Sequence, residues 1–386
     1  MRLSVIKIIV LIVSILGLFG VIFYFSGLSG SRLGSAGAGF AGGLGYVFLL
    51  ESAFRVRVRL KTGKPYQLIP KIPFEEMYIE PHPYISYVYK KNVKTQREVT
   101  ANYEFMGKRE YRFGCFRTNN FRHINGPDGG RDIIVPKPEG LYRIHCLGAS
   151  TTANYLIYKE EAYSYPLQLE KVLKSRFPDR NIEVNNCGVG GYTTAEILVK
   201  FLLDLIDTKP DLVVFYHGYN DLPASLTTGF QSDYSHARRN LGETYHQYRT
   251  ASRFPYIPLA VYNFFVNVFF PQNLRYTLLA SVARGMIDIQ NEFKGLETYK
   301  RNIEHLIHIC NGNGIQIVLS TFCHYLHSRK KMNPLHLKYG EGVVLENEII
   351  KELAQKHSLP LVDNDALIPR QDDYFVDSIH FSHQGI

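Results

Sequence analysis

Residues 142–151 have the sequence YRIHCLGAST, in which an apolar run is followed by small residues and a serine. The apolar part predicts a buried strand over 142–147, and the change after Gly148 predicts that a helix begins near Ser150. A serine at such a junction exposes its hydroxyl beside backbone N–H groups, and a neighbouring base would make it a nucleophile. An ordinary helix N-cap uses the same residue types, so the rest of the chain has to decide.

The alternation of strand and helix continues beyond this run. Strands are expected at 142–147, 182–184, 212–216, 315–319 and 361–362, with helices at 164–175, 194–207, 296–310 and 343–357. Apolar strands separated by amphipathic helices predict an α/β fold in which helices cover both faces of a parallel sheet. Ligands of such sheets bind at the carboxyl ends of the strands.

Three further short blocks lie at or after later strands. They are residues 186–191 (NCGVGG), 218–221 (GYND) and 377–380 (DSIH). They supply a glycine N–H, an asparagine amide and a histidine with a carboxylate, which an acyl-transfer site needs beside a serine. Each block alone has an ordinary interpretation, such as a glycine turn or an Asx-turn at Asn220. The agreement of four blocks favours the catalytic interpretation.

In this order the four blocks resemble the SGNH branch of the GDSL hydrolase family, over roughly residues 140 to 386. The resemblance implies a flavodoxin-like three-layer fold with a central parallel sheet. It implies that Ser150 is the nucleophile, His380 the general base and Asp377 the carboxylate that orients the histidine. It also implies an oxyanion hole made by the N–H groups of Ser150 and Gly191 and the side chain of Asn220.

Two features depart from the family pattern. The aspartate that usually precedes the serine is Ala149 here. Family members also usually continue into a last helix that packs the histidine loop, whereas this sequence ends at Ile386. The first departure leaves the four catalytic elements in place, whereas without a last helix we expect His380 to be less firmly held.

Charge and composition exclude several other classes of function. The net charge is +9, but the basic residues are dispersed except for a cluster at 55–64. Because that cluster follows an apolar N-terminus, it favours a membrane surface or a topology signal, and we expect no nucleic-acid partner. The five cysteines lack Cys-x-x-Cys spacing and the histidines join no carboxylate cluster, so we expect no metal and no cofactor.

The N-terminal region predicts a membrane anchor within residues 1–31. Residues 8–25 are uncharged and mostly apolar, long enough to cross a bilayer. We interpret residues 32–64 as a flexible linker, because six glycines lie between positions 34 and 45. A second span across the membrane, or cleavage near residues 36–38, are the alternatives. The favoured arrangement places the catalytic domain outside the cytoplasm, in the periplasm or at the cell surface.

Two other regions are set apart from the hydrolase domain at 140–386. Residues 65–139 predict a Tyr-rich, extended and β-rich pre-domain, with strand-like composition at 84–89. Residues 222–290 interrupt the strand–helix alternation, and their apolar stretch at 256–270 suits a lid, a membrane-touching helix or a helix packed on the domain.

These observations predict a membrane-anchored serine esterase that cleaves an O-acyl ester on a carbohydrate or a lipid. An O-acyltransferase acting on a cell-surface polysaccharide would use the same residues, because only the acyl acceptor differs. A non-catalytic binding protein with the same fold is the third interpretation.

Overall fold

In a computed structural model the chain forms two compact units, which we describe separately. The larger unit comprises residues 78–238 and 279–386, and the smaller comprises residues 1–77 and 239–278. The structure describes residues 17, 20–22, 24, 32–62, 78–80, 82–94, 99–102, 110–113, 117–125, 130–154, 156–158, 161–227, 229–237, 287–326 and 334–386.

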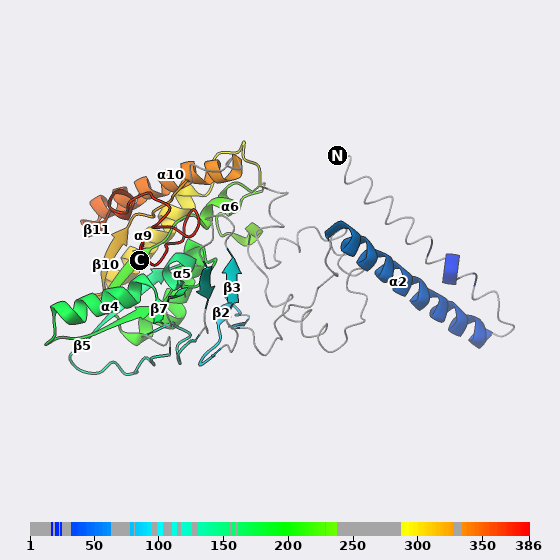
Figure 1. The fold of residues 1–386 in the computed structure, drawn as a ribbon, viewed down its shortest axis with the longest axis horizontal. Helices are drawn as coiled ribbons and strands as arrows, with labels where there is room; N and C mark the ends of the chain where they lie inside the picture. Colours follow the sequence, from blue (N-terminus) through cyan, green and yellow to red (C-terminus); the bar gives the residue numbers. More distant parts are fainter. Residues whose placement is uncertain are drawn as a thin grey trace. The chain divides into compact units, whose positions relative to one another are not determined.

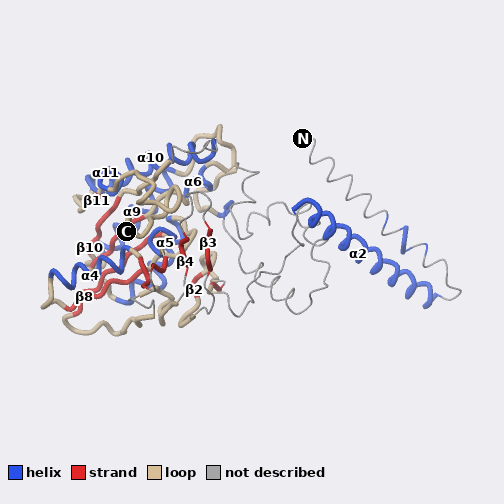
Figure 2. Tube along the Cα trace, in the orientation of Figure 1, coloured by secondary structure: helices blue, strands red, loops and turns tan. Residues whose placement is uncertain are grey.

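A five-stranded parallel sheet forms the centre of the larger unit (Figures 1 and 2). Its strands are β5 (Leu141–Gly148), β8 (Asn181–Asn186), β9 (Leu212–Tyr216), β10 (Gln316–Ser320) and β11 (Leu361–Val362). Their spatial order is β11-β10-β9-β5-β8, and every neighbouring pair is parallel. Numbered by chain order, this is the 2-1-3-4-5 arrangement of flavodoxin-like folds. The α/β fold with a central parallel sheet is therefore confirmed.

The main helices connect these strands. They are α4 (Tyr165–Arg176), α5 (Thr194–Lys200), α9 (Leu296–Gly312) and α10 (Pro334–Lys356). The order of the strands and right-handed crossovers put α4 on one face of the sheet and the other three on the opposite face. Accordingly, α4 packs against β8, while α9 packs against both α5 and α10. Helices and strands thus form three layers.

The core between these layers consists of the apolar residues that the strand pattern predicts. Ile144, Cys146, Ile182 and Val184 form one buried cluster, against which residues of α4 pack. Val213 and Leu319, on neighbouring strands, are fully buried. Burial on both faces explains why β9, with the sequence LVVFY, is a continuous apolar run rather than an alternating one.

The helix predicted at 194–207 is present but changes its winding. After α5, residues Phe201–Leu205 form a π-helical turn and Ile206–Thr208 a 3₁₀ turn. Lys209 then adopts a left-handed conformation with φ of 57°, which ends the helix before β9. The apolar periodicity placed this helix correctly but carried no information about its hydrogen-bonding pattern.

The chain ahead of β5 contributes strands to two small antiparallel sheets. One pairs β1 (Ile79–Glu80) with β2 (Val88–Tyr89), so only two residues of the strand-like 84–89 segment form a strand. The other has the order β3-β4-β6-β7, with β3 at Val99–Asn102, β4 at Glu110–Phe113, β6 at Leu156–Tyr158 and β7 at Glu161–Tyr163. Because β6 and β7 follow Ser150 in the chain, the extension pairs directly with the hydrolase region.

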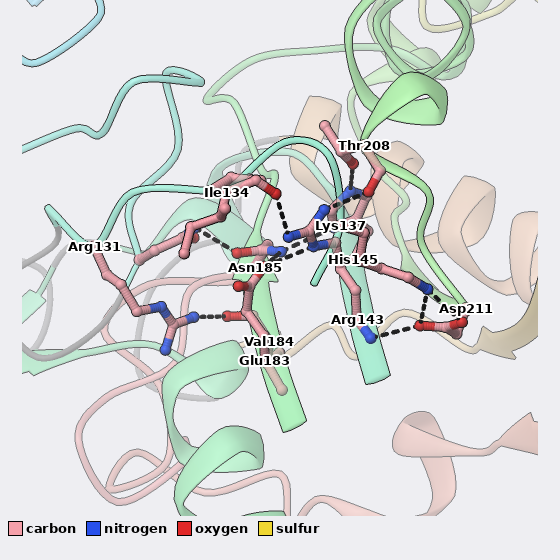
Figure 3. Close-up of polar contacts among 12 residues, drawn as sticks. Arg131, Ile134, Lys137, Arg143, His145, Glu183, Val184, Asn185, Thr208 and Asp211 are labelled. Atoms are coloured by element: carbon pink, nitrogen blue, oxygen red, sulfur yellow. Dashed lines mark hydrogen bonds and ion pairs between the residues drawn. The ribbon is translucent and has the colours of Figure 1, made fainter. Parts of the chain in front are cut away.

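A polar network around Arg143 joins the segment before β5 to the central sheet (Figure 3). The Arg143 guanidinium is fully buried and donates to Glu183 Oε1 at 2.8 Å and to the Ile134 carbonyl at 2.9 Å. It also donates to the Thr208 carbonyl. Because a buried charge is costly unless paired and fully hydrogen-bonded, these partners fix residues on three segments of the chain.

His145 continues this network as a neutral side chain. Thr208 Oγ1 donates to the Leu205 carbonyl at 2.6 Å, so it accepts from His145 Nε2, which lies 2.7 Å away. His145 Nδ1 then accepts from Asn185 Nδ2 at 3.3 Å. Burial, followed by the nearby positive charge of Arg143, lowers the pKa of His145 to about 3, which agrees with this neutral form.

The smaller unit contains the helix α2 (Arg32–Thr62), which corrects our interpretation of residues 32–64 as a flexible linker. Each glycine costs about 1 kcal/mol relative to alanine in a helix. The segment nevertheless has no proline, its glycines are interspersed with alanine and leucine, and Glu51 pairs with Arg55 at 2.6 Å one turn later. The glycines therefore do not prevent a helix in this segment.

The predicted membrane anchor lies mostly outside the described residues, and the apolar stretch of the insertion lies wholly outside them. Among the residues that the structure describes, no helix is both long and apolar enough to cross a membrane. The run at 8–25, where we expect the anchor, is described at only a few positions, and the stretch at 256–270 is not described. The ends of the insertion do meet, because Thr227 and Ile287 form an antiparallel bridge.

Candidate active site

Ser150 lies at the carboxyl end of β5, at the first position of the short helix α3 (Ser150–Ala153). Gly148 ends the strand, and a Cβ there would collide with the Tyr216 carbonyl and the Thr152 side chain. The N-cap position belongs to Ala149, which makes no side-chain cap. The Ser150 hydroxyl therefore does not cap the helix, and its hydrogen bond is to His380 instead.

A loop near the C-terminus brings His380 and Asp377 to this serine across 230 residues of sequence. His380 Nε2 lies 2.9 Å from Ser150 Oγ, and His380 Nδ1 lies 2.8 Å from Asp377 Oδ2. Asp377 Oδ1 accepts the backbone N–H groups of Ile379 at 2.9 Å and His380 at 2.8 Å. The structure thus joins the serine, the histidine and the aspartate into one hydrogen-bonded chain.

Two buried aromatic residues hold this loop on the sheet. Phe375 and Phe381 form an antiparallel bridge, and their ring centroids are 5.2 Å apart. Phe381 stacks on Tyr216 of β9 at 6.3 Å, and the Tyr325 N–H after β10 donates to the Ser378 carbonyl at 2.9 Å. These contacts anchor the loop to two central strands.

The partners of His380 determine where its proton lies. Burial acts to raise the pKa of Asp377, but the charge and hydrogen bonds of His380 and the two backbone donors outweigh it, so this pKa is lowered. An ionised carboxylate only accepts hydrogen bonds, so His380 Nδ1 carries the proton. In the neutral imidazole, Nε2 then has its lone pair directed at the Ser150 hydroxyl, as a general base requires.

The second block forms a turn beside the serine. After β8 the chain continues along β5, since the Cys187 N–H donates to the Cys146 carbonyl at 3.0 Å. The turn follows, and Gly191 has φ of 78°, a conformation that favours glycine. Among the described residues, the backbone N–H groups of Gly191 and Ser150 donate to no acceptor. Both N–H groups are therefore available to a bound oxyanion.

Asn220 lies at the end of a strained turn after β9. Tyr219 has φ of 74°, and the Asn220 N–H donates to the Gly218 carbonyl at 2.9 Å, which defines a γ-turn with positive φ. The Asn220 side chain makes no helix cap. Its Nδ2 donates to the Tyr192 carbonyl at 2.9 Å, which orients the amide and leaves the second N–H of the NH₂ group as a donor.

Glu346 of α10 supports this strained turn, and the sequence analysis did not identify it. Its Oε2 accepts the Tyr219 N–H at 2.8 Å, across 127 residues of sequence. Gly218 lies directly on the same carboxyl and on Phe322, because a Cβ at this position would meet both side chains. No local pattern marks a glutamate in the middle of a helix for such a role.

Glu346 is also a buried carboxyl whose surroundings favour its protonated form. Burial, together with the negative charge of Asp221, raises its pKa well above the usual range. Once the pH rises above the ordinary glutamic acid pKa, the unfolded chain releases this proton and the folded chain retains it. Because the folded state then binds more protons, the contribution of Glu346 to stability falls as the pH rises through that range.

Asp221 completes the support of the third block. Its carboxylate accepts Thr194 Oγ1 at 2.6 Å, Tyr234 Oη at 2.7 Å and His217 Nε2 at 2.8 Å. These partners come from α5, from the start of the insertion and from the end of β9. Because its oxygens are used in this way, Asp221 has a structural role beside Asn220.

One group of side chains among the described residues is close enough to share a metal ion: Glu304, His308 and His357. Glu304 already accepts Lys356 Nζ at 2.5 Å and His357 Nε2 at 3.0 Å. These hydrogen bonds lower the pKa of Glu304 to about 2. The group contains none of the residues around Ser150. Its Glu304, on α9, forms an ion pair with Lys356 and a hydrogen bond with His357 at the end of α10.

Comparison with known proteins agrees with this geometry. The sequence model of the GDSL-like lipase/acylhydrolase family matches residues 146–385, which is most of the chain and contains every residue of the Ser150 site described above. The chain belongs to this family. It is accordingly a hydrolase that acts on ester bonds.

Solved structures of acylhydrolases and an esterase are similar to the chain at low sequence identity. A putative acylhydrolase from Bacteroides fragilis is 16% identical, with 66% of this chain and 84% of that chain covered and a TM-score of 0.36. A lipase/acylhydrolase from Enterococcus faecalis is 22% identical, with 63% and 89% covered and a TM-score of 0.36. A catalytic mutant of an acetylxylan esterase from Geobacillus stearothermophilus is 15% identical, with 63% and 88% covered and a TM-score of 0.39. No curated protein matches the sequence.

Proposed function

We propose that this protein is a serine esterase that removes an O-acyl group from a carbohydrate or a lipid through an acyl-serine intermediate. The observation that carries the proposal is the hydrogen-bonded chain from Ser150 through His380 to Asp377, with distances of 2.9 Å and 2.8 Å. Nucleophile, base and orienting carboxylate are within the contact distances that such catalysis needs.

In the acylation step, Ser150 Oγ attacks the ester carbonyl while its proton moves to His380 Nε2. The carbonyl oxygen becomes an oxyanion, which the N–H groups of Ser150 and Gly191 and the Asn220 amide stabilise. His380 then gives the proton to the leaving alcohol oxygen as the carbon–oxygen bond breaks. Asp377 stabilises the imidazolium form of His380 during this step and does not itself take up the proton.

In the deacylation step, water takes the place of the alcohol. His380 removes a proton from the water, the resulting hydroxide attacks the acyl-serine, and the same three donors stabilise the second oxyanion. Breakdown of this intermediate releases the carboxylic acid, and the proton returns from His380 to Ser150 Oγ.

We also propose that the chain is anchored in a membrane by residues 8–25, with the hydrolase domain in the periplasm or at the cell surface. The uncharged apolar run between Lys7 and the glycines that follow supports the anchor. An esterase in that place would act on acylated glycans or lipids of the cell envelope. Its location is tested by protease accessibility of an epitope at the C-terminus in intact and in permeabilised cells.

The catalytic proposal is tested with the full-length chain and its Ser150→Ala and His380→Ala variants. We expect fluorophosphonate labelling and p-nitrophenyl acetate turnover in the parent protein, and loss of both in each variant. The exposed serine variant Ser358→Ala serves as the matched control and retains both. Labelling of a folded parent protein that persists in Ser150→Ala would refute the proposed nucleophile.

Turnover of acylated sugars and of lipid esters then identifies the substrate class. A preference of kcat/KM for acetylated oligosaccharides identifies a carbohydrate esterase, whereas activity that rises on lipid vesicles identifies a lipid substrate. An acyl-enzyme that is stable in water but decays when a sugar is added would identify an acyltransferase and refute the hydrolytic proposal.

A further inference from the structure

Two tyrosines of the N-terminal extension contact the glycine turn beside Ser150. Tyr87, just before β2, and Tyr89, within β2, are almost completely buried. Both bond to Gly190, which is about a hundred residues away in sequence. The Tyr87 ring also meets the Tyr192 ring edge-on, with centroids 5.5 Å apart.

These tyrosines bond to both polar groups of the Gly190 backbone. The Tyr87 hydroxyl donates to the Gly190 carbonyl, and the Gly190 N–H donates to the Tyr89 hydroxyl at 3.0 Å. In return, the Tyr192 hydroxyl donates to the Tyr87 carbonyl. The extension and the turn are therefore joined by three hydrogen bonds across a buried contact.

The bond from Tyr87 determines the direction of the neighbouring oxyanion donor. The carbonyl of Gly190 and the N–H of Gly191 belong to one planar peptide group and point in opposite directions. A hydrogen bond that holds the carbonyl therefore holds the N–H as well. A peptide between two glycines would otherwise rotate easily, because both residues accept either sign of φ. A bond to the carbonyl also polarises the peptide and strengthens its N–H as a donor.

The turn that the tyrosines hold lies against the nucleophile and the second donor. A Cβ added to Gly190 would lie 3.8 Å from Ser150 Cβ and 3.8 Å from the Tyr89 hydroxyl. The Tyr192 carbonyl, two residues along the turn, accepts the Asn220 amide at 2.9 Å. The same turn therefore positions the Gly191 N–H and orients the Asn220 side chain.

We propose that Tyr87 and Tyr89 are positioning residues of the oxyanion hole, and that the extension is in this way a part of the catalytic machinery. Neither tyrosine touches the substrate in this proposal. Tyr87 prevents rotation of the Gly190–Gly191 peptide, and Tyr89 holds the preceding peptide. The inference rests on the proposed function, in which Gly191 donates to the oxyanion.

The experiment compares Tyr87→Phe, Tyr89→Phe and the control Tyr84→Phe in the full-length chain. Tyr84 is the matched control because it lies in the same segment and is 66% exposed. Loss of a whole oxyanion donor lowers turnover by about 10²–10³. Because Tyr87→Phe loosens a donor without removing it, we expect kcat for p-nitrophenyl acetate to fall about 10- to 100-fold, with KM within about 2-fold. We expect a smaller fall of kcat in Tyr89→Phe and no change of kcat in Tyr84→Phe.

A second measurement separates positioning from a general effect on folding. Phenylboronic acid forms a tetrahedral adduct with a catalytic serine, and its Ki reports how well the oxyanion hole binds that geometry. We expect Ki to rise in Tyr87→Phe by the same factor by which kcat/KM falls. A purely structural role would lower the melting temperature and the fraction of active enzyme while leaving Ki unchanged.

The outcomes distinguish this inference from the proposed function. If Ser150→Ala is inactive but Tyr87→Phe retains kcat and Ki within about 2-fold of the parent, the positioning role is refuted and the esterase remains. If Ser150→Ala keeps its turnover, the proposed function itself fails. Should Tyr87→Phe not fold, Tyr89→Phe decides, because an unchanged Ki in that variant also refutes the inference.

Discussion

Replacement of Asp377 by asparagine tests the proton arrangement of the site most directly. In the structure, Asp377 Oδ1 accepts two backbone N–H groups, from Ile379 at 2.9 Å and from His380 at 2.8 Å, while Oδ2 faces His380 Nδ1. The asparagine oxygen can occupy only one of these two places. The NH₂ group must occupy the other.

The backbone donors decide which way the asparagine amide is oriented. If its NH₂ group faced the two N–H groups, both donors would lose their acceptor, at about 1–3 kcal/mol each. The opposite orientation is thus favoured by about 2 kcal/mol or more, or roughly 30-fold or more. It places the NH₂ group against His380 Nδ1, which must then accept, so the histidine proton moves to Nε2. In that form His380 cannot take the Ser150 proton.

We therefore expect Asp377→Asn to lower kcat by about 10⁴, equivalent to about 5.5 kcal/mol of transition-state stabilisation. The assay is steady-state hydrolysis of p-nitrophenyl acetate, together with the rate of fluorophosphonate labelling. Asp373→Asn, an exposed carboxylate in the same loop, is the control and should stay within about 2-fold of the parent. A folded Asp377→Asn variant that keeps more than about a tenth of the parent kcat would refute the reasoning.

Three further outcomes follow from other parts of the structure. Asn220→Ala should lower kcat by about 10²–10³ with little change in KM, and a loss confined to KM would contradict its role as an oxyanion donor. Glu346→Gln keeps the acceptor for the Tyr219 N–H without a titrating proton. Its melting temperature should therefore decline less between pH 5 and pH 8 than that of the parent protein, and parallel declines would show that Glu346 does not titrate as its raised pKa requires. Leu319→Ala, at a fully buried position of β10, should lower the free energy of unfolding by about 2–5 kcal/mol in urea titrations, whereas Leu367→Ala, 69% exposed, should change it by less than about 0.5 kcal/mol. A similar loss in both variants would contradict the packing of the sheet.

The local pattern of the chain was sufficient to predict the central sheet. The five strands are at the predicted positions within about two residues, because each is a short stretch with apolar residues between amphipathic helices. The 31 residues of α2 were predicted to be flexible but form a helix, because the low helix propensity of the glycines does not by itself prevent one. Tyr84–Tyr89 was recognised as strand-like, but nothing in that stretch indicated what its tyrosines would contact.

The four blocks of the candidate site were visible in the sequence because each carries its functional groups within a few residues and ends or follows a strand. Carboxyl ends of neighbouring parallel strands meet at one edge of the sheet, so blocks at three such ends necessarily converge. The spacing of Asp377 and His380 is local as well, and a single loop can bring both to the serine. The chain by itself therefore determined which residue types meet at Ser150.

Only the tertiary structure decided how those residues are held. Glu346 reaches Tyr219 across 127 residues, and Tyr87 reaches Gly190 across 103. Neither pair has a local signature, because a glutamate in a helix and a tyrosine in an extended segment are ordinary in their own surroundings. Their roles arise when packing buries polar groups, since a buried donor or acceptor must find whichever partner the fold places beside it. Short sequence motifs supply the functional groups of the site, whereas the orientation of these groups depends on contacts that exist only in the folded chain.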